Sequence, residues 1–137
     1  MWVILGCYTY FYYICMFNIG FMEFSATKIE ALRELIATPQ SIVILSHTNP
    51  DGDAVGSSLA WAEILRKQGH EVTCILPNRY PYYLEFMPDI SSVVIFKQDD
   101  KGAAKEAIKR ADIIFCLDFH LLSRLDQLGD LIDENQT

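Results

Sequence analysis

The sequence has no excess of positive charge and no glycine-rich phosphate-binding loop. Its 11 lysines and arginines stand against 18 aspartates and glutamates, for a formal net charge of −7, whereas a general grip on nucleic acid needs a basic surface. The chain contains no G-x-G-x-x-G or G-x-x-x-x-G-K pattern, which argues against the common dinucleotide and P-loop sites. We therefore expect no binding to duplex nucleic acid, although bound metal ions would reverse the local charge for a nucleotide.

Cysteines are few, and no two of them form the C-x-x-C pair of common zinc and redox sites. The sequence has four, at Cys7, Cys15, Cys74 and Cys116. The last two fall in apolar runs that predict buried strands, so we expect reduced thiols that act as small apolar side chains. Reduced cysteines are typical of reducing compartments. We therefore expect a cytoplasmic protein.

Charged residues are absent from residues 1–21, which are rich in apolar and aromatic side chains. This segment is long enough to span a bilayer as a helix, but it lacks the basic start and the cleavage site of a signal peptide. We expect either an extension from an upstream start codon, with Met22 as the true initiator, or a membrane anchor. The chain is therefore divided into a hydrophobic extension, residues 1–21, and a domain, residues 22–137.

Short apolar runs alternate with amphipathic segments after residue 25. Continuous apolar runs bounded by turn residues predict strands covered on both faces, and they lie at residues 42–45, 71–76, 93–96 and 113–117. Helical periodicity predicts helices at residues 55–65, 104–111 and 121–131. Because strands separated by helices indicate βαβ units, we predict an α/β fold with a Rossmann-like parallel sheet of about four strands and flanking helices.

The turn between the first of these strands and its helix carries an imidazole and two carboxylates, from His47, Asp51 and Asp53. Ligands of parallel sheets bind beyond the carboxyl ends of the strands, and one nitrogen with two oxygens suits Mn²⁺, Fe²⁺ or Mg²⁺. A structural alternative is that Asp53 only caps the helix. We also expect Gly56 to permit a close approach at the first helical turn.

A further carboxylate, from Asp118, ends the last predicted strand. If that strand lies beside the first, the side chains of His47, Asp51, Asp53 and Asp118 converge at one edge of the sheet. The pattern therefore predicts a metal site built from two strand ends.

Residues 47–57, His-Thr-Asn-Pro-Asp-Gly-Asp-Ala-Val-Gly-Ser, resemble the first motif of the DHH phosphoesterase superfamily. Within it they are most similar to the bifunctional oligoribonuclease and adenosine 3′,5′-bisphosphate (pAp) phosphatase group, the NrnA type. Residues 116–125, in which Arg124 follows Asp118 by six positions, resemble the second motif. Family II inorganic pyrophosphatases carry a similar first loop, so the motif identifies the superfamily better than the substrate.

The resemblance implies a pair of Mn²⁺ ions held by four side chains. The implied metal ligands are His47, Asp51, Asp53 and Asp118, with Asp118 as the candidate bridge between the ions. The three aspartates are accordingly the candidate catalytic residues. For substrate binding we name Arg124, for which a surface ion pair is an equal alternative, and Ser57, whose amide lies near a helix N-terminus.

The resemblance also implies an activity. We expect a metal-dependent phosphoesterase that hydrolyses short oligoribonucleotides or pAp; the alternatives are an inorganic pyrophosphatase and a non-catalytic α/β module that binds a nucleotide or a partner. Its partners would be a nucleotide or short single-stranded RNA, a membrane only if residues 1–21 are real, and a second copy in a full-length homodimer. The superfamily's Asp-His-His motif is absent, so we expect the N-terminal part of a DHH domain with little turnover of its own.

An aromatic cluster follows the second predicted strand. It consists of Tyr80, Tyr82, Tyr83 and Phe86. Such rings could stack on a nucleobase, but packing over the sheet is their commoner use.

Overall fold

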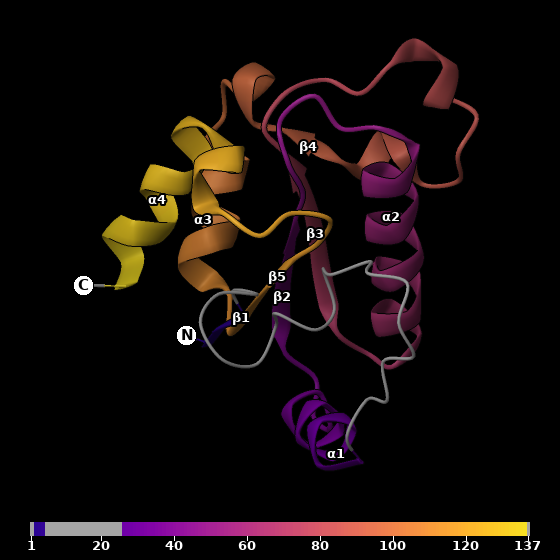
Figure 1. Ribbon diagram of the computed structural model, residues 1–137, viewed down its shortest axis with the longest axis vertical. Helices are drawn as coiled ribbons and strands as arrows, with labels where there is room; N and C mark the ends of the chain where they lie inside the picture. The colour runs from indigo at the N-terminus through magenta and orange to yellow at the C-terminus, as the bar shows by residue number, and fades with distance from the viewer. Residues whose placement is uncertain (1, 5–25, 137) are drawn as a thin grey trace.

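The chain folds around a parallel sheet with helices on both of its faces (Figure 1). This computed structural model describes residues 2–4 and 26–136. The strands are β1 (Trp2–Ile4), β2 (Ser41–Leu45), β3 (Glu71–Leu76), β4 (Val94–Ile95) and β5 (Ile113–Cys116), and they are ordered β1-β5-β2-β3-β4. The α-helices are α1 (Ala26–Leu35), α2 (Gly52–Lys67), α3 (Ala103–Arg110) and α4 (Gln127–Gln136).

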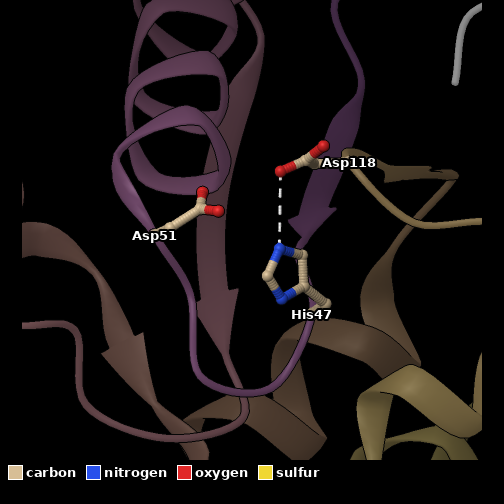
Figure 2. A group of neighbouring side chains, drawn as sticks. All are labelled: His47, Asp51 and Asp118. Atoms are coloured by element: carbon tan, nitrogen blue, oxygen red, sulfur yellow. Dashed lines mark ion pairs between the residues drawn. The ribbon is translucent and has the colours of Figure 1, made fainter. Parts of the chain in front are cut away.

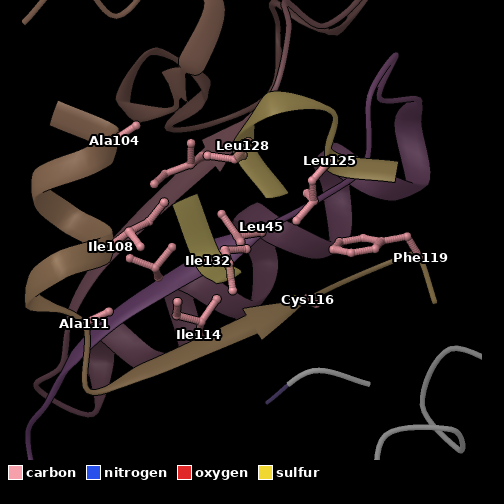
Figure 3. Close-up of a cluster of buried hydrophobic side chains, with 12 residues drawn as sticks. Leu45, Ala104, Ile108, Ala111, Ile114, Cys116, Phe119, Leu125, Leu128 and Ile132 are labelled. Atoms are coloured by element: carbon pink, nitrogen blue, oxygen red, sulfur yellow. The ribbon is translucent and has the colours of Figure 1, made fainter. Parts of the chain in front are cut away.

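The two faces of the sheet are built from alternating residues of the same strands. On β2, Ile42 and Ile44 pack with Ala62 and Leu65 of α2, and the side chains of α1 join this cluster. The alternate residues of β2, Val43 and Leu45, point to the opposite face, where they pack with residues of α3 and α4 (Figure 3). Since successive side chains of a strand face opposite sides, strands that are buried on both faces read as continuous apolar runs. This burial confirms the predicted α/β fold.

All four predicted strands form, and the structure adds a fifth. Strand β1 pairs in parallel with β5, from Trp2 opposite Ile113 to Ile4 opposite Phe115. It lies inside the segment that we expected to be an extension outside the domain. Most of that segment, including Cys7, Cys15 and Met22, lies outside the described residues, as does nearly all of the proposed anchor. Within the part of the chain that is described, no helix is both long enough and apolar enough to cross a membrane.

The expectation of one helix over residues 121–131 is wrong. A 3₁₀-helix, η4 (Leu122–Leu125), comes first, and α4 starts two residues later. Between them Asp126 has φ 55° and ψ −140°, a backbone conformation that no α-helix can contain. The apolar spacing misled the prediction because Leu125, Leu128 and Ile132 all reach the same core across this break.

The cysteines of the sheet behave as expected. Cys74 and Cys116 are buried and form no disulfide. Burial raises the pKa of the Cys74 thiol to about 11, so it stays protonated and unreactive at neutral pH.

Candidate metal centre

The carboxyl ends of β2 and β5 are joined by hydrogen bonds that bring two candidate ligands side by side. The strands are parallel neighbours, with Leu45 opposite Cys116. Just beyond this pair, the Leu117 amide donates to the Leu45 carbonyl at 2.9 Å, and the Ser46 hydroxyl donates to the Leu117 carbonyl at 2.9 Å. The next residues along the two strands are His47 and Asp118. The condition that we placed on the metal site, that the first and last predicted strands are neighbours, is therefore met.

Three of the four predicted ligands gather at this edge (Figure 2). One ligand atom each from His47, Asp51 and Asp118 lies within 4.8 Å of the other two. Within this group, His47 Nε2 lies 3.4 Å from Asp118 Oδ2. His47 is 6% exposed, while both carboxylates are exposed. The site is therefore a buried imidazole at the base of an open acidic pair.

The ring of His47 is held with its Nε2 atom directed toward Asp118. Its Nδ1 lies 2.8 Å from the Thr48 carbonyl, and because a carbonyl can only accept, Nδ1 carries the hydrogen. In the neutral ring the Nε2 lone pair then faces Asp118, where two acceptors would repel each other unless a proton or a cation lies between them. A second hydrogen bond of this kind is the usual way in which proteins orient a metal-binding histidine.

Asp51 is both a member of this group and the N-cap of α2. One of its carboxylate oxygens accepts from the amides of Asp53 and Ala54, at 3.1 Å each. The hydrogen bond from the Ala54 amide is the largest cause of the lowered pKa of the Asp51 carboxyl group. The hydrogen bond from the Asp53 amide and the electrostatic attraction of His47 lower this pKa further, whereas the slight burial of the group opposes the shift. A carboxylate has about four lone-pair directions, so the two hydrogen bonds from backbone amides leave the Asp51 carboxylate free to bind a cation as well.

Asp53 occupies a different place. The alternative that it caps the helix is wrong, because Asp51 does so. Asp53 is exposed in the first turn of α2 and is not one of the three grouped side chains. Its role as a ligand stays a prediction. The expectation for Gly56 is also wrong, since a Cβ at that position would meet nothing within 4 Å.

The backbone around the site is turned by two non-glycine residues with positive φ. Asn49 has φ 54° and Asp118 has φ 66°. This left-handed conformation costs of order 1 kcal/mol for residues other than glycine, least for Asn and Asp, and is common at functional sites. At Asp118 this backbone conformation is held by its two neighbours, since the Leu117 amide donates to the Leu45 carbonyl and the side chain of Phe119 is buried. The sequence alone does not reveal this turn.

Asn78, which follows β3, braces the loop that carries His47 and Asp51. Its side-chain oxygen accepts from the Asn49 amide at 2.7 Å, and its NH₂ group donates to the Asn49 side chain at 3.3 Å. Sequence reasoning missed this residue, although its position directly beyond a predicted strand, at the same sheet edge, was a usable signal. The Thr48 amide is tied separately to the Arg124 carbonyl at 2.8 Å.

The two predicted substrate-binding residues lie outside the three-residue group. Arg124 is exposed on η4 and contacts the loop through its backbone carbonyl. Ser57 is exposed on α2, and its hydroxyl donates to the Ala54 carbonyl at 3.3 Å. Beside the loop lies an open polar hollow of about 440 Å³, lined by Thr48, Asn49, Asn78, Lys97, Ser123 and Asp126. The contacts of Arg124 and Ser57 do not test whether these residues bind a substrate, so these roles stay predictions.

The donor set of this edge fits a divalent cation. One imidazole nitrogen and two carboxylate groups are ligands that Mn²⁺, Fe²⁺ and Mg²⁺ accept, and this group of described residues contains no thiolate, which would favour zinc. The geometry fits the chemistry because the one buried ligand is an imidazole oriented by the Thr48 carbonyl, while the two carboxylates stay in contact with water. The three side chains suffice for one ion.

Comparison with known proteins agrees with this site. Residues 41–136 match the DHH family, N-terminal domain. The chain is 27% identical to a "Probable manganese-dependent inorganic pyrophosphatase" from Oceanobacillus iheyensis over 99 residues, 61% of this chain and 32% of that protein. It is 36% identical, with a TM-score of 0.72, to the crystal structure of an exopolyphosphatase-related protein from Bacteroides fragilis, covering 76% of this chain and 30% of that one.

The chain spans about a third of the length of these two relatives. Neither is described as an oligoribonuclease or a pAp phosphatase, so the narrower NrnA-type grouping stays a prediction. The family match covers β2 to α4, which includes the whole group of His47, Asp51 and Asp118. The chain therefore belongs to the DHH family, and its residues 41–136 correspond to the N-terminal domain of that family.

Proposed function

We propose that this chain supplies the metal-binding edge of a metal-dependent phosphoesterase, with Mn²⁺ as the ion. The single observation that carries the proposal is the approach of His47, Asp51 and Asp118, whose ligand atoms lie within 4.8 Å of one another at the carboxyl edge of the sheet. The family match and a relative described as manganese-dependent support it. The buried, reduced cysteines Cys74 and Cys116 support the proposal of a cytoplasmic enzyme.

The proposed roles of the site residues follow from how exposed each side chain is. A bound divalent ion would polarise a phosphoryl oxygen and acidify a water molecule. His47 would bind the ion through Nε2, from the buried side of the site, with its ring held by the Thr48 carbonyl. Asp51 would bind it through an ionised carboxylate that the hydrogen bonds of the N-cap hold in place. Asp118 faces both groups and is the proposed bridge to a second Mn²⁺ ion, for which the exposed Asp53 is the proposed further ligand. Arg124 and Ser57 are the proposed contacts to the substrate phosphate.

The proposed substrates are short oligoribonucleotides and pAp. The Asp51-Gly-Asp53 form of the first motif and its resemblance to the oligoribonuclease and pAp phosphatase group support them. Inorganic pyrophosphate is the second candidate, because one relative is described as a probable manganese-dependent inorganic pyrophosphatase. The two candidates differ in whether the substrate carries a base.

The proposal is tested with the complete product of the gene, loaded with Mn²⁺. Its hydrolysis of a diribonucleotide, pAp and pyrophosphate should fall at least about a hundredfold in Asp51→Asn, since removal of a metal ligand removes charge stabilisation of several kcal/mol. The exposed residue Asp130, on α4, is not part of the group, so Asp130→Asn should keep the wild-type rates. Metal-dependent turnover that is equal in all three proteins would exclude this site, and the ratio of the substrates identifies which candidate is correct.

A further inference from the structure

Three large aromatic side chains on the segment between β3 and β4 face solvent. Tyr82 is 82% exposed, Tyr83 59% and Phe86 80%. The expectation that this cluster packs over the sheet is therefore wrong for these three rings, and it is correct only for Tyr80, which packs against a buried cluster. Exposed rings that are grouped on one short segment are uncommon on a surface that binds nothing.

The segment that presents these rings is fixed, so their exposure is not that of a loose loop. Leu84 and Ile90, on either side of Phe86, are buried with Val55 of α2. The 3₁₀-helix η1 (Tyr82–Leu84) is held by its own backbone bonds, from Leu84 to Pro81 and from Glu85 to Tyr82. The rings of Tyr82 and Tyr83 also meet edge to face, with centroids 5.9 Å apart. The outward direction of the rings is thus built into the fold.

This segment adjoins the metal-binding loop at two separate places. At its start, Asn78 bonds to Asn49 of the loop at 2.7 Å and 3.3 Å. Further along, Leu84 Cδ2 lies 4.0 Å from the place that a Cβ of Gly52 would take, directly after the ligand Asp51. Figure 1 shows the segment arching from the end of β3 over the N-terminal end of α2. The rings and the metal centre therefore belong to the same edge of the molecule.

We propose that Tyr82, Tyr83 and Phe86 form a platform on which the bases of a short single-stranded oligonucleotide stack, while its phosphodiester reaches the metal centre. The inference rests on the proposed phosphoesterase function and adds to it the residues that would hold the bases of the substrate. A chain of net charge −7 gains little from the phosphate backbone away from the metal, whereas every base offers a face to an aromatic ring. Pyrophosphate and polyphosphate have no such face and would not use the platform.

The test measures base stacking directly on the full chain. A dinucleotide that contains 2-aminopurine is titrated with the protein in the presence of Mn²⁺, because the fluorescence of this base is quenched when it stacks on an aromatic ring. Phe86→Leu and Tyr82→Leu keep an apolar side chain but remove the ring, and each should weaken binding about tenfold with loss of quenching. Phe86→Trp should restore both. Ile64→Ala, at an exposed apolar residue of α2, is the matched control and should bind like the wild type.

Failure of the platform and failure of the proposed function give different results. Quenching that survives in the Leu variants, or that is absent in the wild type, overturns the platform even if the gene product hydrolyses pyrophosphate. Ring-dependent quenching without metal-dependent hydrolysis keeps the platform and rejects the phosphoesterase. If the Leu variants instead change only the sedimentation coefficient of the chain, the rings form an interface between copies and the base platform is rejected.

Discussion

Asp51 combines an observed role as a helix cap with a proposed role as a metal ligand. Its carboxylate caps α2 through the amides of Asp53 and Ala54, and the same group approaches His47 and Asp118. The residue types of the site were predictable from the sequence, since a histidine and acidic residues after a strand have a known chemistry. The left-handed backbone of Asp118 was not, because it depends on bonds between β2 and β5 that no local pattern encodes.

Substitution at Asp51 should separate its two functions. Asp51→Ala removes the cap and should lower the free energy of unfolding by about 1 kcal/mol. Asp51→Asn keeps a capping oxygen and loses only the charge near the helix N-terminus, so it should cost about 0.5 kcal/mol. Both variants should weaken Mn²⁺ binding at least about tenfold, the effect known even for groups that only orient a metal ligand. Urea unfolding and a metal titration measure the two effects, and equal stability of the two variants would contradict the capping role.

The cap also predicts a dependence on pH. The folded-state pKa of Asp51 is lowered, first by the bond from the Ala54 amide, below its value of 3.8 for an unperturbed aspartate. The stabilisation from its charge is therefore complete above pH 3.8 and is lost as the pH falls through the lowered pKa. The difference in unfolding free energy between the wild type and Asp51→Asn should be present at pH 6 and disappear in strong acid. An NMR titration of the Asp51 carboxyl with a midpoint at or above 3.8 would refute this cause.

At the scale of elements, the sequence predicted best where burial alone decides. The runs at residues 42–45, 71–76 and 113–117 are strands in the structure because both of their faces are covered. The last segment was mispredicted because its break depends on contacts from elsewhere. The Arg124 carbonyl accepts from Thr48, and Asp126, whose backbone makes the break, pairs with Lys97 at 2.8 Å. Apolar periodicity contains neither contact.

Two glycines inside helices should respond to alanine in opposite ways. A Cβ at Gly56 of α2 meets nothing within 4 Å, so Gly56→Ala should raise the unfolding free energy by about 0.5–1 kcal/mol. At Gly129 of α4 a Cβ would lie 3.0 Å from the Leu122 carbonyl oxygen. That backbone contact cannot relax by a change of rotamer, so Gly129→Ala should lower the unfolding free energy by about 1 kcal/mol. Thermal unfolding of both variants checks the pair; stabilisation by Gly129→Ala would show that η4 and α4 pack more loosely than the structure indicates.

For the whole molecule, the order of the strands decides whether there is a site at all. β2 and β5 are separated by two strands and two helices in the sequence, yet they are neighbours in the sheet. The sequence predicted parallel strands and placed acidic residues at their ends, but it left the neighbours open. The position of the aromatic segment beside the metal loop was likewise beyond sequence reasoning, because it rests on the hydrogen bond of Asn49 to Asn78 and on the packing of Leu84 near Gly52.

The most direct test of the metal centre is a titration with Mn²⁺ followed by electron paramagnetic resonance, in which the signal of the free hydrated ion disappears on binding. The chain is first freed of metal with EDTA, and Asp118→Asn is compared with Asp130→Asn. We predict that the wild type and Asp130→Asn bind Mn²⁺ equally, and that Asp118→Asn, which retains a side chain tolerant of positive φ, binds at least about tenfold more weakly. Equal Mn²⁺ affinity of Asp118→Asn and the wild type, or no uptake by the wild type, would contradict the assignment of His47, Asp51 and Asp118 as a metal centre.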